Sequence, residues 1–326
     1  MSIIRFIKNW TLPVSIAGGI IIYLVFALTP ALDGAARFCA PICDRILPLF
    51  MFLILFVTFC KVDFRRLVPV RWILWVSVVQ VALVAVVTLI TVELGLSGRS
   101  LILMEAILTC IIGPCAAAAP VVTAKLGGNL EQMTTYTFAS NFITALLIPI
   151  CFPLIDRSAS ISFVQAFLTI LHEVCSVLLL PMLMAYVVKH TMHRFHKWVT
   201  GVKDLSYYMW GGSLLIVSGT TAKNIAHADT TLGFLVIIGM LGLLLCIVQF
   251  ATGRFIGHYF GVTTEAGQAL GQKNTAFAIW IAYTYLHPLS SIGPGCYILW
   301  QNIINSVEIW HYRKHEEAAK GKRVKE

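Results

Sequence analysis

Charged residues are scarce in this chain of 326 residues. Asp, Glu, Lys and Arg make up 12% of it, whereas 58% is hydrophobic and the mean hydropathy is +0.84. In soluble globular domains about a quarter of the residues are charged. The shortage of charge therefore excludes a soluble domain and predicts a polytopic all-α membrane protein that is surrounded by the lipid bilayer.

Motifs for metal or nucleophile chemistry are also missing. The nine cysteines form no CxxC pair and mostly fall in apolar runs, which is typical of small buried hydrophobes. Neither HExxH nor GxSxG occurs, and His172-Glu173 alone makes no catalytic constellation. The net charge of +9 comes from short loops and the chain ends, so it does not indicate nucleic acid. We expect no enzyme, no cofactor and no obligate protein partner.

Ten apolar runs are long enough to cross about 30 Å of hydrocarbon. They lie near 12–30, 40–60, 71–96, 101–126, 130–155, 162–188, 204–224, 230–257, 262–286 and 290–311. The first run ends in Thr29-Pro30 without a small-residue cleavage site, so we expect a retained helix. Alternating loops place most of the 24 lysines and arginines on the side of both chain ends. The positive-inside rule then predicts a multi-pass inner-membrane protein with both termini in the cytoplasm.

A basic segment at 189–203 divides the runs into two groups of five. An odd number of spans inserts the second half upside down relative to the first, which is the topology of inverted-repeat transporters. The two halves have little direct sequence similarity, so this expectation rests on the number of spans. The charged tail 313–326 is expected to be a solvated helix end.

The fourth and ninth runs are interrupted in the middle. Gly113-Pro114 and Pro120 interrupt the fourth run, and Gly267 and Gly271 stand beside Gln272-Lys273-Asn274 in the ninth. Each proline removes a backbone donor and clashes with the preceding turn. Broken helices in matching positions predict a transport site, because half-helix ends present unpaired N–H groups to anions and carbonyls to cations.

Lys273 lies in the middle of the apolar stretch 262–286. In a continuous helix it would be roughly 17 Å from either end, too far for a side chain of about 6 Å to reach water. A cation at that depth costs at least about 2.5–3.5 kcal/mol, so it faces a protein partner or a hydrated cavity. The competing explanation is an ion pair that only fixes helix packing.

Other polar side chains in the apolar runs have two explanations each. Glu265 lies one turn before Ala269 and could supply a carboxylate to the site. Glu173 could meet Lys273 or belong to a structural network. The remaining candidates either line a cavity or form interhelical hydrogen bonds. They are Asn141, Thr144, Gln301, Asn302 and Asn305.

Several motifs, in order along nearly the whole chain, resemble those of the bile acid:sodium symporter family in its bacterial ten-span form. They are Lys61-Val62-Asp63-Phe64, Pro114 to Thr123 with Gly128-Asn129, Gly271 to Ala278, Pro294-Gly295, and Trp300 to Ile303. The resemblance implies a core domain in which the two broken helices cross, packed against a panel domain. The core would comprise 61–157 and 229–312, the panel 1–60 and 158–228, and 313–326 would be the cytoplasmic tail.

The family resemblance implies a secondary transporter of a small or amphipathic organic anion that works by alternating access. Known members carry bile acids, sulfated steroids, pantoate or pyruvate, most of them with two sodium ions. The positions of several family sodium ligands are occupied here by residues that offer no side-chain oxygen: Ala119, Pro120, Met133 and Ala269. Sodium needs several hard oxygen ligands. We therefore expect both sodium sites to be lost, although Gln80 and Thr137 are kept.

Lys273 stands where the family has a glutamine of the second sodium site. Its ammonium brings one positive charge and three donors, so it can replace a sodium ion physically. A permanently protonated amine implies uniport or exchange, and an amine that gains and loses its proton implies proton coupling. Direct pairing with a substrate carboxylate, beside Gln272 and Asn274, is compatible with either. The alternatives are a conventional sodium symporter with rearranged sites and a membrane sensor that transports nothing.

Overall fold

The computed structural model describes residues 10–155, 163–174, 176, 179–202 and 204–323, which are nearly all helical and include no strand. An all-α protein is thereby confirmed for the described part of the chain. The first helices are α2 (Thr11–Leu28), α3 (Asp33–Lys61), α4 (Arg71–Glu93), α5 (Gly98–Ile112), α6 (Ala119–Lys125) and α7 (Leu130–Ile155). Next come α8 (Phe163–Val174), α9 (Leu180–Thr191), α10 (His193–Gly201) and α11 (Leu205–Ala226). The last are α12 (Leu232–Phe260), α13 (Thr263–Gly271), α14 (Thr275–Tyr285) and α15 (Ile292–Arg323).

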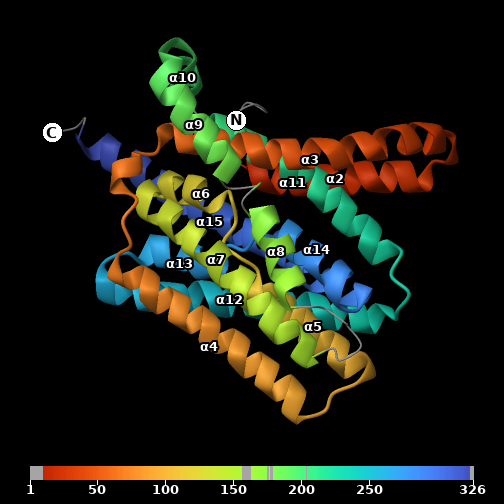
Figure 1. Ribbon diagram of the computed structural model, residues 1–326. Coiled ribbons are helices and arrows are strands. Elements are labelled where there is room, and N and C mark those ends of the chain that lie inside the picture. The colour runs from red at the N-terminus through yellow and green to blue at the C-terminus, as the bar shows by residue number, and fades with distance from the viewer. Residues whose placement is uncertain (1–9, 156–162, 175, 177–178, 203, 324–326) are drawn as a thin grey trace.

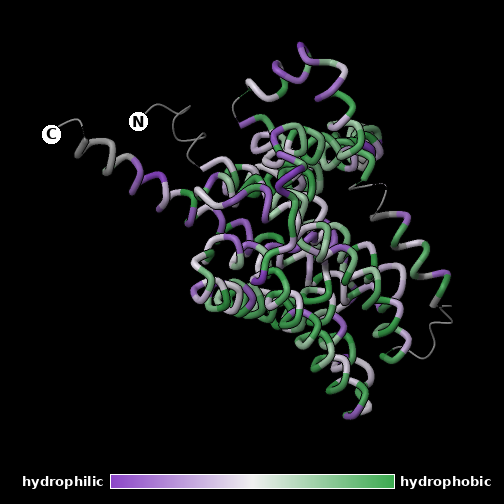
Figure 2. The backbone as a smooth tube through the Cα atoms, turned by 60° about the vertical axis from the view of Figure 1, so that its left-hand side comes forward, coloured by the Kyte–Doolittle hydropathy of each residue, from purple (hydrophilic) through white to green (hydrophobic). Residues whose placement is uncertain are grey.

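Five segments are long and apolar enough to cross a membrane. They are Thr11–Leu28, Pro30–Lys61, Arg71–Glu93, Leu130–Ile155 and Leu232–Phe260. Large apolar side chains such as Leu74 and Leu232 are 65% and 76% exposed, as expected where lipid replaces water. Hydrophobic residues run along most of the helices, and hydrophilic ones gather in α10 and toward the end of α15 (Figure 2). These features confirm a membrane protein.

The other five predicted runs have a different form. The runs at 101–126 and 262–286 are each divided between two shorter helices, and two further runs correspond to α11 and to α15. The run at 162–188 contains α8 and α9, and residues 175, 177 and 178 between them lie outside the described part of the chain. The predicted tail continues α15 without a break as far as Arg323. The boundary expected near 157 lies outside the described residues.

The helices form two layers with α15 between them (Figure 1). In one layer α2 packs along α11, and α3 packs against α9 and α11. Gly19 of α2 leaves room for the backbone of Leu215, since a Cβ there would overlap it. Small residues permit such close packing in membrane helices, where apolar burial gives little driving force. In the other layer α4, α5, α7 and α14 share an apolar cluster around Ile112 and Ile148.

The turn from α12 into α13 shows how the sequence returns a short helix along a long one. Gly261 ends α12 with φ 68°, a left-handed conformation that suits glycine. Beyond it α13 packs back along α12. The two helices are so close that a Cβ at Gly253 would overlap the backbone of Ala266, and one at Gly257 would overlap that of Val262. This close packing fixes where the chain leaves α13.

Candidate functional site

The two predicted interruptions meet inside the molecule. Between α5 and α6, and again between α13 and α14, the chain leaves the helix, and Cys115 and Lys273 pair as an isolated antiparallel bridge. The N–H of Ala116 donates to the carbonyl of Gln272 at 3.0 Å, and that of Asn274 donates to Pro114 at 2.7 Å. Four helix ends therefore surround one buried crossing point.

The prolines make this crossing possible in two different ways. Pro114 lies in the extended segment, where its missing N–H is not needed and its carbonyl accepts from Asn274. Pro120 lies in the first turn of α6, where no intrahelical donor is required, so it starts the half-helix rather than breaking it. Asn274 caps α14 by accepting from the N–H of Phe277 at 3.2 Å.

Side chains from α7 and α15 hold the crossing segments. The amide of Gln301 accepts from the Lys273 N–H at 2.9 Å and donates to the Lys273 carbonyl at 3.1 Å. On the other segment, the hydroxyl of Ser140 accepts from the Cys115 N–H at 3.0 Å. Gln301 thus satisfies the backbone of Lys273, and it is not among the residues that line the neighbouring cavity of about 530 Å³.

Lys273 is only 1% exposed, and its ammonium donates to the carbonyl of Ile111 at 3.0 Å. Ile111 belongs to the last turn of α5, where carbonyls lack intrahelical partners and carry the negative end of the helix dipole. None of the ion pairs found among the described residues includes Lys273. The alternative of a side-chain ion pair that fixes packing therefore finds no support in the described residues. The Lys273 amine therefore lies at a half-helix C-terminus.

The four positions where the family resemblance implies sodium ligands are occupied by buried hydrocarbon. Ala119, Met133 and Ala269 are each 0% exposed and belong to one apolar cluster with Cys115 and Leu270. Pro120 is also buried. Methyl, thioether and ring carbons offer no hard oxygen ligand for sodium.

The two polar residues kept from that set are engaged with protein groups. Gln80 donates to the Gly113 carbonyl at 3.5 Å and accepts from the hydroxyl of Tyr136 at 3.0 Å. Thr137 donates to the Met133 carbonyl at 2.9 Å. Among the described residues there is no group of three or more His, Cys, Asp or Glu side chains that could hold a metal.

A cavity of about 530 Å³ lies beside the crossing, between α3, α7 and α14. Its walls are mostly apolar, from Pro48 and Phe52 of α3 to Phe277 and Trp280 of α14. Asn141 and Asn274 are the candidate residues that line it, whereas Lys273 and Gln272 are not among its lining residues. A site of this size, with few polar groups in apolar walls, suits a small or amphipathic molecule.

The remaining candidates lie in several places. The side chain of Gln272 is fully buried without a hydrogen-bond partner, and Asn302 donates to Ile298 within its own helix at 2.7 Å. Thr144 donates to the Ile112 carbonyl at 2.8 Å, and Asn305 accepts from Gln268 at 2.9 Å. The side chain of Glu173 lies outside the described residues.

Two buried carboxylates hold the loops that follow the broken helices. Glu265 of α13 accepts from the N–H of Asn129, just before α7, at 2.7 Å. Glu105 of α5 accepts from the N–H of His287, before α15, at 3.1 Å. Each carboxylate therefore anchors the loop of the other half of the chain, and Glu265 contacts backbone rather than Lys273.

Sequence reasoning missed five residues of this arrangement: Glu105, Tyr136, Ser140, Gln249 and Tyr297. Three of them belong to glutamine–tyrosine pairs. Gln249 donates to the hydroxyl of Tyr297 at 3.0 Å, and the hydroxyl of Tyr136 donates to Gln80. A buried acid in the fourth run and a glutamine in the eighth were visible in the sequence as polar residues at membrane depth. No pattern within one run could indicate that Glu105 meets His287 of the other half, or that Gln249 meets Tyr297 of another helix. Neither a protein-family model nor a curated protein matches this chain.

Proposed function

We propose that this protein is a secondary transporter of a small or amphipathic organic anion that works by alternating access and needs no sodium. The observation that carries the proposal is the crossing of two interrupted helices, with the Lys273 amine on the carbonyl of Ile111 in the last turn of α5. Half-helix ends at a shared midpoint are the usual construction of ion and substrate sites in secondary transporters.

The pattern of contacts about the crossing supports two inverted five-helix repeats. Several residues that hold the crossing correspond between the halves: Cys115 with Lys273, Ser140 with Gln301, and Glu105 with Glu265. The Gln80–Tyr136 pair likewise corresponds to the Gln249–Tyr297 pair. Such reciprocity is expected of two copies of one unit related by a two-fold axis in the membrane plane. On this proposal the chain has ten spans, with both ends in the cytoplasm.

The charge at the site also favours replacement of sodium. In the family that the sequence resembles, two sodium ions and one carboxylate give a net charge of +1. Here the carboxylate position is Ala269, and the single ammonium of Lys273 restores the same net charge without a bound ion. The site then has at all times the net charge that members of that family reach only after binding sodium. A net charge that does not change during the cycle favours uniport or exchange. Proton coupling remains the alternative in which the amine is neutral for part of the cycle.

The cavity supports an anion with an apolar body. Phe52, Phe277 and Trp280 give it apolar walls, and the start of α14, with Asn274 and the nearby Asn141, gives it a polar end. The positive end of a helix dipole stabilises an anionic group. Lys273 acts in this arrangement through the crossing segment rather than by direct contact with the substrate.

The proposal is tested by measuring thermal stabilisation and liposome uptake for a panel of small carboxylates and sulfonates in sodium and in choline buffer. We expect at least one anion to be bound and carried equally well in both buffers. Stimulation by sodium of more than several-fold would restore the conventional symporter, and binding without uptake would favour a sensor.

Lys273→Gln provides the matched variant for this assay. It restores the neutral amide that the resemblance places in the second sodium site, so uptake should be lost or should become partly dependent on sodium. Lys197→Gln, in exposed α10, removes the same charge away from the crossing and should behave as wild type. Normal, sodium-independent uptake by Lys273→Gln would reduce this lysine to a structural residue.

A further inference from the structure

A second cavity, of about 600 Å³, lies at the end of α3, between the loop that follows it and α9. Three side chains with fixed positive charge line it, namely Lys61, Arg65 and Lys189. Phe64 and Tyr186 form an aromatic wall, with their rings edge to face at 5.9 Å between centroids. We call this cavity the basic pocket.

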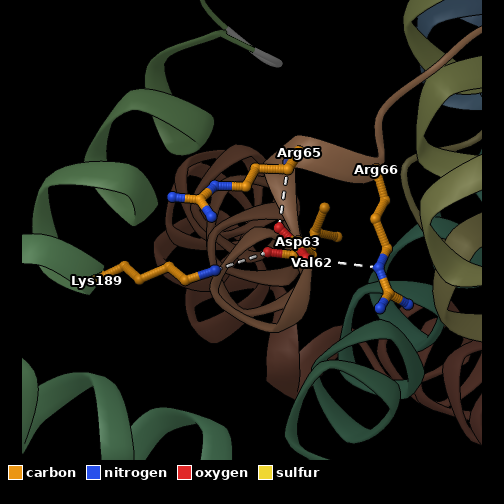
Figure 3. A network of polar contacts seen from close by, with 5 residues as sticks. All are labelled: Val62, Asp63, Arg65, Arg66 and Lys189. Carbon is orange, nitrogen blue, oxygen red and sulfur yellow. Dashed lines mark hydrogen bonds and ion pairs between the residues drawn. The ribbon is translucent and has the colours of Figure 1, made fainter.

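The basic pocket has one carboxylate, and that group is already engaged. Asp63 accepts from the N–H of Arg65 at 3.1 Å, and its second oxygen lies 3.6 Å from the guanidinium of Arg66 (Figure 3). Neither Lys61 nor the side chain of Arg65 takes part in any ion pair found among the described residues. Three fixed positive charges therefore face one carboxylate, and the pocket carries an excess of positive charge.

Lys189 is held at the edge of the basic pocket from the opposite helix. Its ammonium donates to the Val62 carbonyl at 3.2 Å (Figure 3). The same ammonium lies 5.7 Å from the centre of the Phe64 ring. The contact leaves two of its three N–H donors for another acceptor. His190 lines the same space and its ring packs on Tyr186 at 4.2 Å. Donors from both α3 and α9 thus converge on one volume.

The position of the basic pocket places it at the level of lipid headgroups. One apolar membrane segment, Pro30–Lys61, ends at this pocket. The turns of α9 that precede Lys189 carry exposed apolar side chains: Leu180 is 51% exposed, Leu183 57% and Val187 53%. An apolar strip therefore leads along α9 to a cationic pocket with an aromatic wall. An apolar acyl chain joined to an anionic phosphate, as in a phospholipid, matches this sequence of surfaces.

We propose that the basic pocket binds the phosphate of an anionic phospholipid, with an acyl chain along the exposed face of α9. The guanidinium of Arg65 and the ammonium groups of Lys61 and Lys189 donate to the phosphate oxygens, and the adjoining apolar strip selects a lipid over a soluble phosphate. This site is separate from the crossing at Lys273 and requires only that the protein lies in a membrane.

Native mass spectrometry of the purified full chain, with phosphatidylglycerol and phosphatidylcholine supplied in equal amounts, tests the proposal. The wild type should retain phosphatidylglycerol preferentially. The double variant Lys61→Gln, Arg65→Gln should lower that preference by about fivefold for each charge removed. The charge-preserving pair Lys61→Arg, Arg65→Lys should keep most of it. Arg71→Gln removes an exposed charge outside the pocket and should leave the preference unchanged.

Two results would overturn the proposal. One is equal retention of the two lipids by the wild type, and the other is an undiminished preference in a double variant whose melting temperature matches that of wild type. Inorganic phosphate provides the arm for a soluble ligand. If it stabilises the protein through Lys61 and Arg65 while no lipid preference exists, the pocket takes free phosphate and not a phospholipid.

Discussion

Gln272 and Gln301 are both buried beside Lys273, but their amides have opposite surroundings. Gln301 makes two hydrogen bonds, to the N–H and to the carbonyl of Lys273, whereas neither amide atom of Gln272 has a partner among the described residues. A hydrogen bond in a buried site adds little net stability, yet a buried group left without its partner costs about 1–3 kcal/mol. The two glutamines should therefore respond differently to the same substitution.

Gln301→Leu should destabilise the protein by about 2 kcal/mol or more, because it leaves the N–H and the carbonyl of Lys273 unpaired. Gln272→Leu removes an amide that has no partner to lose, so it should be neutral or stabilising. The melting temperature of each purified variant in the same detergent checks this. Equal loss of stability in both would contradict the assigned hydrogen bonds.

At the scale of elements, the end of α13 is set by packing against α12. Gly271 lies against the ring of Phe250, and a Cβ at this position would overlap that ring. Phe250 is itself buried among Cys110, Cys246 and Tyr297, so it has little freedom to move away. The absence of a side chain at Gly271 thus allows the crossing segment to begin where it does.

Gly271→Ala should consequently destabilise the protein, by about 1–3 kcal/mol, the usual cost of overpacking. Gly233→Ala is the matched control, because nothing lies within 4 Å of a Cβ at that position in α12 and the change should stabilise the helix by up to about 1 kcal/mol. Thermal melting of both variants gives the sign. Adding Phe250→Leu to Gly271→Ala should recover part of the lost stability. If it does not, overlap with the Phe250 ring is not the cause of the loss.

The sequence was informative about the breaks and less so about their partners. Gly113-Pro114 and Gly271 predicted where α5 and α13 end, since proline and glycine act locally on the backbone. Pro120 was misread as a second break, because the same residue is well placed in the first turn of a helix. That Gln301 would bind the Lys273 backbone depends on a contact between two different helices, and that Glu105 would meet His287 depends on a contact across 182 residues. Periodicity within one helix carries no such information.

At the scale of the whole molecule, the crossing joins parts of the chain that are far apart in sequence. The bonds from Ala116 to Gln272 and from Asn274 to Pro114 flank the Cys115–Lys273 pair on both sides. Directly opposed residues in such an antiparallel pair have Cα atoms about 4.5 Å apart, within the range that a disulfide spans. The two halves of the molecule should therefore be linkable at this one point.

Lys273→Cys should form a disulfide with Cys115 when the other native cysteines are replaced and a membrane-permeable copper–phenanthroline oxidant is added. The expected product is a linked pair of peptides containing 115 and 273, detected by mass spectrometry before and after reduction. Asn274→Cys is the control, because successive side chains of an extended segment point to opposite sides, so it should link poorly. Equal yields from both variants, or no link from the first, would mean that the two broken helices do not cross at these residues, and the inverted-repeat transporter would lose its structural basis.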